Sequence, residues 1–213
     1  MIEPSTPDTA TATDMALIHG LLQRSESGGL IHCPLMLSPT PIEDSALTRL
    51  QSLTEPFSLL AHRVASELGF LDQQLRQAAA ADDYTRFLLA LALEEQREQA
   101  FRFSITRSDY FLTRSESDHN GALRQVELNT IAASYVGLAG RVPDFYRSWG
   151  GILEQDWEVV PNDPVAVIAD AFLQVMTAYG APDARVLFVV QPEERNIFDQ
   201  RILEIALIAR GIG

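Results

Sequence analysis

Residues 125 to 140 read QVELNTIAASYVGLAG, a run that passes from alternating polar and apolar residues into a series of small ones. Successive side chains of a strand point to opposite faces, so the alternation predicts a strand in which Glu127 and Asn129 share one face with Gln125. The aliphatic residues between them are expected on the other face. This stretch decides the fold because it predicts a strand that ends where a ligand can approach the backbone.

The polar face of this strand carries a carboxylate and an amide oxygen at Glu127 and Asn129. These are hard donors of the kind that Mg2+ takes from proteins, while water and phosphate fill its other positions. Two interpretations are open: the residues bind a cation, or a half-buried strand simply turns its polar side to water. The small residues from Thr130 to Gly140 favour ligand binding, because backbone amides can reach a ligand there.

The composition is that of an ordinary globular protein. Of 213 residues, 46% are hydrophobic and 21% are charged, which excludes a wholly disordered chain. Asp and Glu number 29 against 16 Lys and Arg, giving a net charge of -13, so nucleic acid and anionic membranes are not expected partners. No apolar run is long enough for a membrane-spanning helix, and no secretory or transit signal is evident, which predicts a cytoplasmic protein. The single cysteine, Cys33, is expected to be a small core residue.

The first half of the chain is predicted to be mainly helical. A helix is expected from residue 8 or 9 to about residue 24, followed by an extended segment rich in proline. Further helices are expected in residues 43 to 99, with breaks at Pro56, near Gly69 and around Asp82. Asp82 is expected to cap the last of these helices.

Alternation of apolar and polar residues returns at Phe101 and predicts strand structure through Leu112. A connection from Ser115 to Gly121 that ends in Asn-Gly is expected to reverse the chain into the strand 123 to 128. Pairing of these two segments brings Arg107 close to the two oxygen donors. Arg107 then either forms a surface salt bridge or offers its guanidinium to a substrate carboxylate.

The last third predicts the start of a parallel α/β unit. A helix is expected from about Pro143 to Trp149, and another is expected from Pro164, capped by Asp163, to Gly180. Residues 185 to 191 are apolar enough for a strand buried on both faces of a parallel sheet, and a helix and the start of another strand follow. Because such a unit would leave its sheet edges unpaired, a longer protein or a partner is expected.

Three stretches, read in order, resemble the eukaryotic-type glutathione synthetase family of ATP-grasp ligases. They are ITRSDYFLTR (105 to 114), QVELNTIAASYVGLAGR (125 to 141) and VVQPEERNIFDQR (189 to 201), and a looser match runs from about residue 50 to the end. The resemblance implies an α/β (α+β) fold, with a helix-rich N-terminal part and an antiparallel sheet of the ATP-grasp type. It also implies that residues 1 to 184 belong to the ATP-grasp part and that residues 185 to 213 begin a truncated α/β substrate-binding domain.

The resemblance implies roles for individual residues. Glu127 and Asn129 would bind Mg2+ beside the phosphates of ATP, and Glu127 would also touch the nucleotide. Arg107 would hold a carboxylate of γ-glutamylcysteine, and Glu194 would suit the ammonium of its glutamyl part. Ala132 stands where the family commonly has a hydroxyl residue. The other expected contacts with the dipeptide come from Ile131, Ala132, Ala133, Ser134, Arg195, Asn196 and Gln200.

The implied reaction joins γ-glutamylcysteine to glycine through an acyl phosphate made with ATP, in a protein that is a homodimer when full length. Positioning and charge neutralisation supply such catalysis, so no protein nucleophile is expected. Other nucleotide-binding and glycine-binding groups of the family lie beyond Gly213, and the 213-residue chain alone is expected to be inactive. Two alternatives remain: a non-catalytic γ-glutamyl-peptide-binding or assembly domain, and a metal-assisted hydrolase that uses Glu127.

Overall fold

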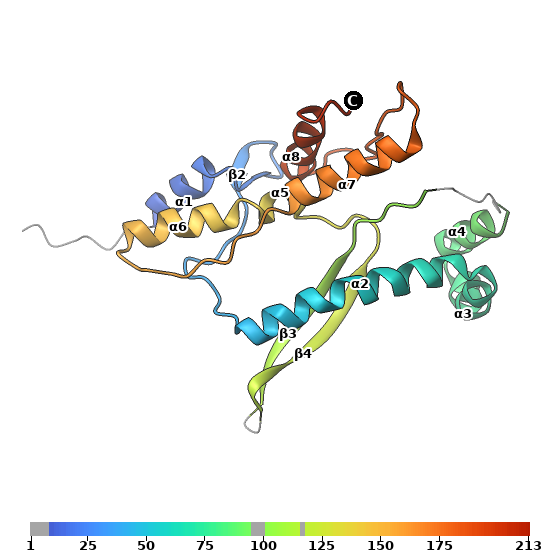
Figure 1. The fold of residues 1–213 in the computed structure, drawn as a ribbon, viewed down its shortest axis with the longest axis horizontal. Helices are drawn as coiled ribbons and strands as arrows, with labels where there is room; N and C mark the ends of the chain where they lie inside the picture. The colour runs from blue at the N-terminus through green and yellow to red at the C-terminus, as the bar shows by residue number, and fades with distance from the viewer. Residues whose placement is uncertain (1–8, 95–100, 116–117) are drawn as a thin grey trace, which may run out of the picture. The chain divides into compact units, whose positions relative to one another are not determined.

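The computed structural model describes residues 9–94, 101–115 and 118–213, which form a mixed, helix-rich structure with two antiparallel two-stranded sheets (Figure 1). The contacts divide the chain into two compact units. Unit 1 combines the N-terminal residues up to Pro41 with Ala133–Gly213, and unit 2 is Ile42–Ala132. The boundary expected between residues 184 and 185 stays a prediction. No helix in the described ranges is long and apolar enough to cross a membrane.

The core of unit 1 forms where α1 (Thr9–Ile18) packs against α6 (Val142–Ile152). The small alanines of α1 let the helices approach, and α6 contributes Phe145 and Trp149, the two largest fully buried side chains of the described residues. The indole Nε1 of Trp149 donates to the carbonyl oxygen of Leu37 over 3.0 Å, which satisfies the polar group of a buried ring. Cys33 packs against this core, as expected, and burial raises the pKa of its thiol. The buried core residues are Ala12, Ala16, Leu21, Phe145 and Trp149.

The first helix ends earlier than predicted. α1 stops at Ile18, and Gly20 adopts a φ of +74°, a left-handed conformation that ends helices and that glycine adopts without strain. The following residues form β1 (Leu22–Arg24), which pairs antiparallel with β2 (Leu30–His32). The prediction of a helix to about residue 24 is therefore wrong, because Gly20 turns the chain before the apolar pattern ends.

The helices of the last third agree with the sequence prediction. The short α5 (Val136–Ala139) precedes α6, and α7 (Pro164–Tyr179) begins as predicted, with Ala166 N donating to Asp163 Oδ1 over 3.0 Å. Gly180, at φ +71°, ends α7. The last helix is α8 (Ile197–Ile208), which contacts both α5 and α7.

Residues 185 to 191 do not form the predicted strand. In the described part of the chain, this segment makes one backbone hydrogen bond to a distant residue, from Val186 N to Gly213 O over 3.0 Å. Leu187 and Val189 are 85% and 89% exposed. A strand of a parallel sheet needs a ladder of such bonds and cover on both faces. This single bond brings residues 186 and 213 together, as neighbouring strands of a parallel sheet would, but one bond does not make a sheet.

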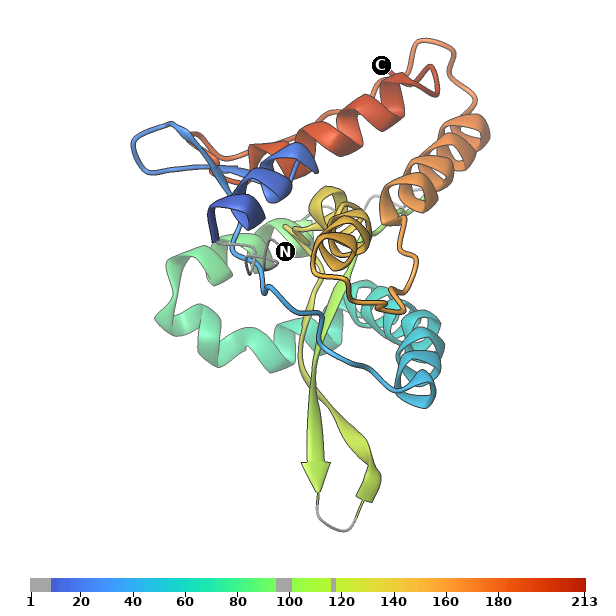
Figure 2. The same ribbon diagram turned by 90° about the vertical axis from the view of Figure 1, so that its left-hand side faces the viewer.

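In its described residues, unit 2 combines three helices with one long hairpin. Figures 1 and 2 show the two strands of the hairpin running side by side, and α2 contacts β4. The helices α3 and α4 pack against each other. The elements of unit 2 are α2 (Asp44–Ser66), α3 (Leu68–Ala81), α4 (Asp83–Glu94), β3 (Arg107–Ser115) and β4 (Asp118–Asn129).

The helix breaks of unit 2 were predicted in part. Asp82 separates α3 from α4 and caps α4 as expected, since Thr85 N donates to Asp82 Oδ2 over 2.6 Å and this bonding lowers the pKa of Asp82. The break near Gly69 lies two residues earlier, at Glu67. The break at Pro56 is wrong: α2 continues through it. An internal proline removes one helical hydrogen bond but does not end a helix whose flanking turns are well formed.

The hairpin exists as predicted, but its limits differ. β3 begins at Arg107 instead of Phe101, and residues 101 to 106 have no partner strand in the described structure. Asn120 and Gly121 lie inside β4, so the Asn-Gly pair is not the turn. The chain reverses between Ser115 and Asp118, and residues 116–117 of the predicted connection lie outside the described residues.

Candidate functional site

The pairing of β3 with β4 gathers four polar side chains at the base of the hairpin. Arg107 lies opposite Asn129, and Asp109 lies opposite Glu127. Residues two apart on a strand share a face, as do residues directly opposite each other, so the four form a two-by-two arrangement. We call this set, Arg107, Asp109, Glu127 and Asn129, the polar block.

Hydrogen bonds connect all four members of the polar block. Arg107 forms a bidentate pair with Asp109, in which Nε donates to Oδ1 over 2.9 Å and Nη2 donates to Oδ2 over 3.1 Å. The same Nη2 lies 3.5 Å from Glu127 Oε1, which also accepts from Asn129 Nδ2 over 2.9 Å. Asn129 Nδ2 lies 3.4 Å from Asp109 Oδ2. The strand pairing thus brings Arg107 to the two oxygen donors, as the sequence predicted.

The charge of the polar block favours a cation. Two carboxylates face one guanidinium, and Arg107 lowers the pKa of Asp109 by hydrogen bonding, so the carboxyl stays ionised. The side chains of Arg107 and Asp109 are each 33% exposed, and that of Glu127 is 55% exposed, so water and ligands can reach them. The described residues contain no group of three or more His, Cys, Asp or Glu side chains that could hold a metal ion, so protein oxygens here would supply only part of a cation's ligands. Carboxylate and amide oxygens at a wet surface fit Mg2+, which keeps several of its waters.

A second group of predicted residues lies in unit 1, just before and within α8. Glu194 Oε1 accepts from Asn196 N over 2.7 Å, which fixes the turn before the helix. Arg195 Nε donates to the carbonyl oxygen of Arg24 over 3.1 Å, and Arg24 N donates to the carbonyl oxygen of Arg195 over 2.9 Å. These bonds hold the loop of the β1–β2 hairpin against the turn. A cavity of about 700 Å3 lies between the two, lined in part by Glu194 and Arg195.

Two side-chain oxygens in this second group lack partners. Asn196 Oδ1 and Gln200 Oε1 are buried, and neither accepts a hydrogen bond from the described residues. A buried acceptor left unpaired costs about 1 to 3 kcal/mol, so each is a place where a ligand N–H or a water would be stabilising. Both residues belong to the predicted dipeptide contacts.

A buried carboxylate fixes the end of the small-residue loop. Asp199 is 6% exposed, and its oxygens accept from three backbone amides: Tyr135 N (2.7 Å), Gly137 N (2.7 Å) and Leu138 N (3.0 Å). Tyr135 has a φ of +75°, a conformation uncommon for a residue other than glycine. Asp199 thus ties α5, which directly follows the predicted ligand loop, to α8, which carries Gln200.

The predicted loop residues lie on both sides of the division between the two units. Ile131, which is 84% exposed, and Ala132, at φ +50°, end unit 2, and Ala133 and Ser134 begin unit 1. The predicted site residues therefore form two groups. One is the polar block with the start of the loop, and the other is the end of the loop with residues 194 to 200.

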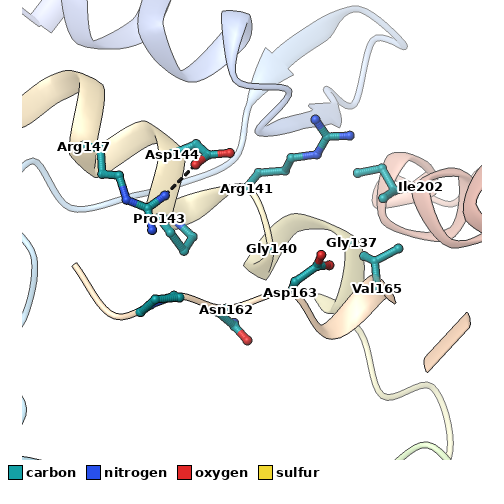
Figure 3. Close-up of a pocket in the computed structure, with 11 residues that line it drawn as sticks. Gly137, Gly140, Arg141, Pro143, Asp144, Arg147, Asn162, Asp163, Val165 and Ile202 are labelled. Atoms are coloured by element: carbon teal, nitrogen blue, oxygen red, sulfur yellow. Dashed lines mark hydrogen bonds and ion pairs between the residues drawn. The ribbon is translucent and has the colours of Figure 1, made fainter. Parts of the chain in front are cut away.

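A second cavity of unit 1 is less suited to a ligand. It has a volume of about 520 Å3 and lies beside α6 and the start of α7. Figure 3 shows that Arg147 is engaged by Asp144, at 2.6 Å, and that the side chains of Arg141 and Asn162 point in different directions. Asp163 already caps α7. Because its polar groups do not converge on one point, this cavity is not the candidate site.

The family models decide the identity of the chain. The model described as eukaryotic glutathione synthase, ATP binding domain, matches residues 8–192, and the model described as eukaryotic glutathione synthase matches residues 184–212. The chain belongs to the eukaryotic glutathione synthase family. The resemblance stated from the three sequence stretches is confirmed, and both the polar block and the turn before α8 lie inside the matched ranges.

Individual relatives agree with the family models. The glutathione synthetases of Homo sapiens and Xenopus laevis are 35% and 34% identical over 212 residues, covering 94% of this chain and 44% of each relative. A chloroplastic glutathione synthetase of Solanum lycopersicum is 33% identical over 192 residues, covering 85% of this chain and 34% of the relative. The chain therefore spans less than half the length of these curated relatives.

The fold has a solved counterpart. A glutathione synthetase-like effector of Globodera pallida, solved in its apo form, superposes with a TM-score of 0.77 at 21% identity. The match covers 95% of this chain and 46% of that chain. At this identity the likeness shows that the two share a fold.

Two residues of the candidate site were missed by sequence reasoning, and one of them belongs to the polar block. Asp109 was not singled out, although it lies two residues after Arg107 and therefore on the same strand face. Asp199 was also missed. Its only signal was a carboxylate placed among apolar helix residues, one position before the predicted contact Gln200.

The prediction for Gln125 is wrong. Asp109 pairs with Glu127 whereas the next residue, Tyr110, pairs with Gln125, so Val126 is an extra residue on β4. Such a bulge interrupts the regular alternation of faces. Gln125 Nε2 donates to Ser108 Oγ over 3.0 Å, on the face opposite the polar block. Bulges are common beside functional sites, where they redirect side chains.

Proposed function

We propose that this chain carries the cation-binding hairpin and part of the dipeptide site of a glutathione synthetase, which joins γ-glutamylcysteine to glycine at the expense of ATP. The observation that carries the proposal is the polar block. It presents two carboxylates, an amide and a guanidinium on one strand face, within the range matched by the ATP-binding domain. A reaction between a carboxylate and ATP brings anions together and needs this combination of groups.

In this proposal, Glu127 and Asn129 hold Mg2+ beside the ATP phosphates, and Glu127 also faces the nucleotide. Bound there, the ion would neutralise the phosphoryl charge. The residue types support this role, since a carboxylate and an amide oxygen are hard ligands and Glu127 is partly exposed. Asn129 Nδ2 donates to Glu127 Oε1 here, so its amide would turn over to present Oδ1 to the ion. Arg107 lies within hydrogen-bonding distance of this pair and orients a carboxylate of γ-glutamylcysteine.

The rest of the dipeptide contacts the loop and the turn before α8. Residues 131 to 134 are small apart from Ile131, so the dipeptide can lie close to their backbone. Glu194 offers a negative charge for the glutamyl ammonium, with Arg195 beside it in the cavity lining. The unpaired oxygens of Asn196 and Gln200 support the same role, because the dipeptide has the N–H donors that they lack.

Four broader features also belong to the proposal. The hairpin is part of an antiparallel sheet of the ATP-grasp type, and residues 185 to 213 begin the parallel α/β substrate-binding domain. Support for that boundary is the second family match, which begins at residue 184. The full-length protein acts in the cytoplasm as a homodimer. Size-exclusion chromatography with light scattering tests the dimer directly.

The test is a ligation assay on two proteins, the 213-residue chain and the product of the complete reading frame. Each is incubated with ATP, Mg2+, γ-glutamylcysteine and glycine, and ADP and tripeptide are measured together. The proposal expects stoichiometric ADP and glutathione from the complete product, and none from the 213-residue chain. Dipeptide binding without ADP release would favour the non-catalytic binding domain, and loss of dipeptide without ATP would favour the hydrolase.

A further inference from the structure

Asp109 has a contact geometry that the proposed function does not yet use. Its carboxylate meets Arg107 through two parallel hydrogen bonds, Nε to Oδ1 at 2.9 Å and Nη2 to Oδ2 at 3.1 Å. Guanidinium and carboxylate match in this two-pronged arrangement, which fixes the plane of the guanidinium as well as its position. A single contact would leave a long arginine side chain many rotamers.

The same geometry makes Asp109, rather than Glu127, the closer partner of Arg107. Arg107 Nη2 lies 3.1 Å from Asp109 Oδ2 and 3.5 Å from Glu127 Oε1, so the shorter contacts are with Asp109. If the charge of Asp109 were lost, Glu127 would be the one carboxylate of the polar block left to pair with Arg107.

Asp109 lies next to the β-bulge, at the point where it pairs with Glu127. Asp109 is the last residue of β3 before the register shifts, and its partner Glu127 directly follows the extra residue Val126. The bulge therefore places the two carboxylates side by side on one face, while Gln125 faces the other way. An ordinary surface ion pair has no such arrangement around it.

We propose that Asp109 is a positioning residue, which holds the Arg107 guanidinium in a fixed orientation toward the substrate carboxylate and leaves Glu127 only the longer of that group's two carboxylate contacts. This inference rests on the proposed function, in which Arg107 binds the dipeptide and Glu127 binds Mg2+. Asp109 itself need not touch either ligand. Its loss raises the concentrations of dipeptide and of Mg2+ that are needed, while the chemical step is less affected.

The kinetic test compares Asp109→Asn and Asp109→Glu in the product of the complete reading frame. Asp109→Asn keeps the shape and removes the charge, and we expect it to raise the KM for γ-glutamylcysteine by about 10-fold with a smaller change in kcat. The apparent affinity for Mg2+ should fall in the same variant. Asp109→Glu restores the charge and should recover part of the loss.

A matched control removes a different ion pair of the same kind. Asp72→Asn breaks the exposed pair between Asp72 and Arg76, whose atoms lie 2.6 Å apart on α3, and should leave both constants unchanged. If Asp109→Asn behaves like this control in an active enzyme, the positioning role is overturned while the ligase proposal stands. If the wild-type protein neither binds the dipeptide nor ligates it, the ligase proposal itself fails.

A second readout does not depend on activity. The Nε–H signal of Arg107 in 15N NMR reports whether its guanidinium is held. We expect restricted motion and slow hydrogen exchange of this group in the wild-type chain, both lost in Asp109→Asn and largely kept in Asp109→Glu. An Arg107 signal equally mobile in the wild type and in Asp109→Asn would overturn the inference.

Discussion

At the scale of single residues, Asp199 is the side chain on which the order of the ligand loop depends most. It is buried and accepts three backbone hydrogen bonds from the residues that open α5. A charged acceptor in such a position is stronger than a neutral one, and removing it leaves buried amides without a partner.

We expect Asp199→Asn to lower the free energy of unfolding by about 1 to 3 kcal/mol, because the amide NH2 cannot accept and one or more backbone donors lose their bond. Chemical denaturation measures this change. Asp156→Asn is the control, since Asp156 is exposed. A loss no greater than that of the control would mean that the Asp199 bonds contribute little.

Gly137 allows α5 to pack closely against α8. A Cβ atom there would lie 2.7 Å from the Asp199 carbonyl oxygen and 2.9 Å from Ile202 Cβ, so the backbone of α8 would have to move. We expect Gly137→Ala to lower the free energy of unfolding by about 1 to 3 kcal/mol. Gly151→Ala is the matched control, because a Cβ at Gly151 meets nothing within 4 Å in helix α6. It should be neutral or stabilising, and equal effects at the two positions would contradict the close packing.

The pair of Arg107 and Asp109 makes a prediction about pH. The hydrogen bond from Arg107 lowers the pKa of Asp109 in the folded protein, so its contribution to stability is present above the pKa of the unfolded carboxyl. That contribution is lost as the pH falls through the folded pKa, which lies below the usual range of aspartate. A 13C NMR titration of the carboxyl group measures it. We expect Arg107→Gln to raise the pKa of Asp109, and an unchanged titration would show that the arginine is not its cause.

The residues of the site were predictable where the signal was local. Strand alternation was enough to place Glu127 beside Asn129, and the expected pairing of the two strands brought Arg107 to them although the turn lies before Asn120. Asp109 could have been found by the same rule. Asp199 could not, because its partners are amides some 60 residues away in sequence, and only the packing of α5 on α8 brings them together.

At the scale of elements, the residues that begin or end helices decided which helix predictions were confirmed. The helices α4 and α7 begin at aspartates that accept a backbone hydrogen bond, and the caps were visible in the sequence. The first helix was predicted too long, since Gly20 ends it while the apolar pattern runs on. Pro56 gave the opposite error, because a proline weakens a helix without having to end it.

The strands were harder to predict than the helices because each depends on a partner. The apolar run at residues 185 to 191 has the composition of a buried strand but makes a single backbone hydrogen bond to Gly213 in the described structure. The bulge at Val126 has no local sequence signal, and it alone reversed the expected face of Gln125. Register is set by the two strands together, so alternation in one strand predicts faces only up to a bulge.

At the scale of the whole molecule, the predicted site residues belong to two compact units. The polar block belongs to unit 2, and the turn before α8 and its unpaired oxygens belong to unit 1. The family resemblance named three members of the polar block, all but Asp109, and the residues before α8, and no local pattern would have related the two groups to each other. The chain spans 44% of its human relative, so the groups that complete the proposed reaction are sought in the remainder of such a protein.

The measurement that tests the account most directly is the Mg2+ dependence of ligation in Glu127→Gln, made in the product of the complete reading frame. The change keeps the shape of the side chain and removes the charge that would face the cation. Glu158→Gln, at an exposed position that is not part of the polar block, is the control. We predict that Glu127→Gln lowers turnover by about 100-fold or more, with the thermal unfolding of wild type, while the control stays active. Near wild-type turnover with an unchanged Mg2+ requirement would contradict the account, since Glu127 would then be only a polar residue of a hairpin.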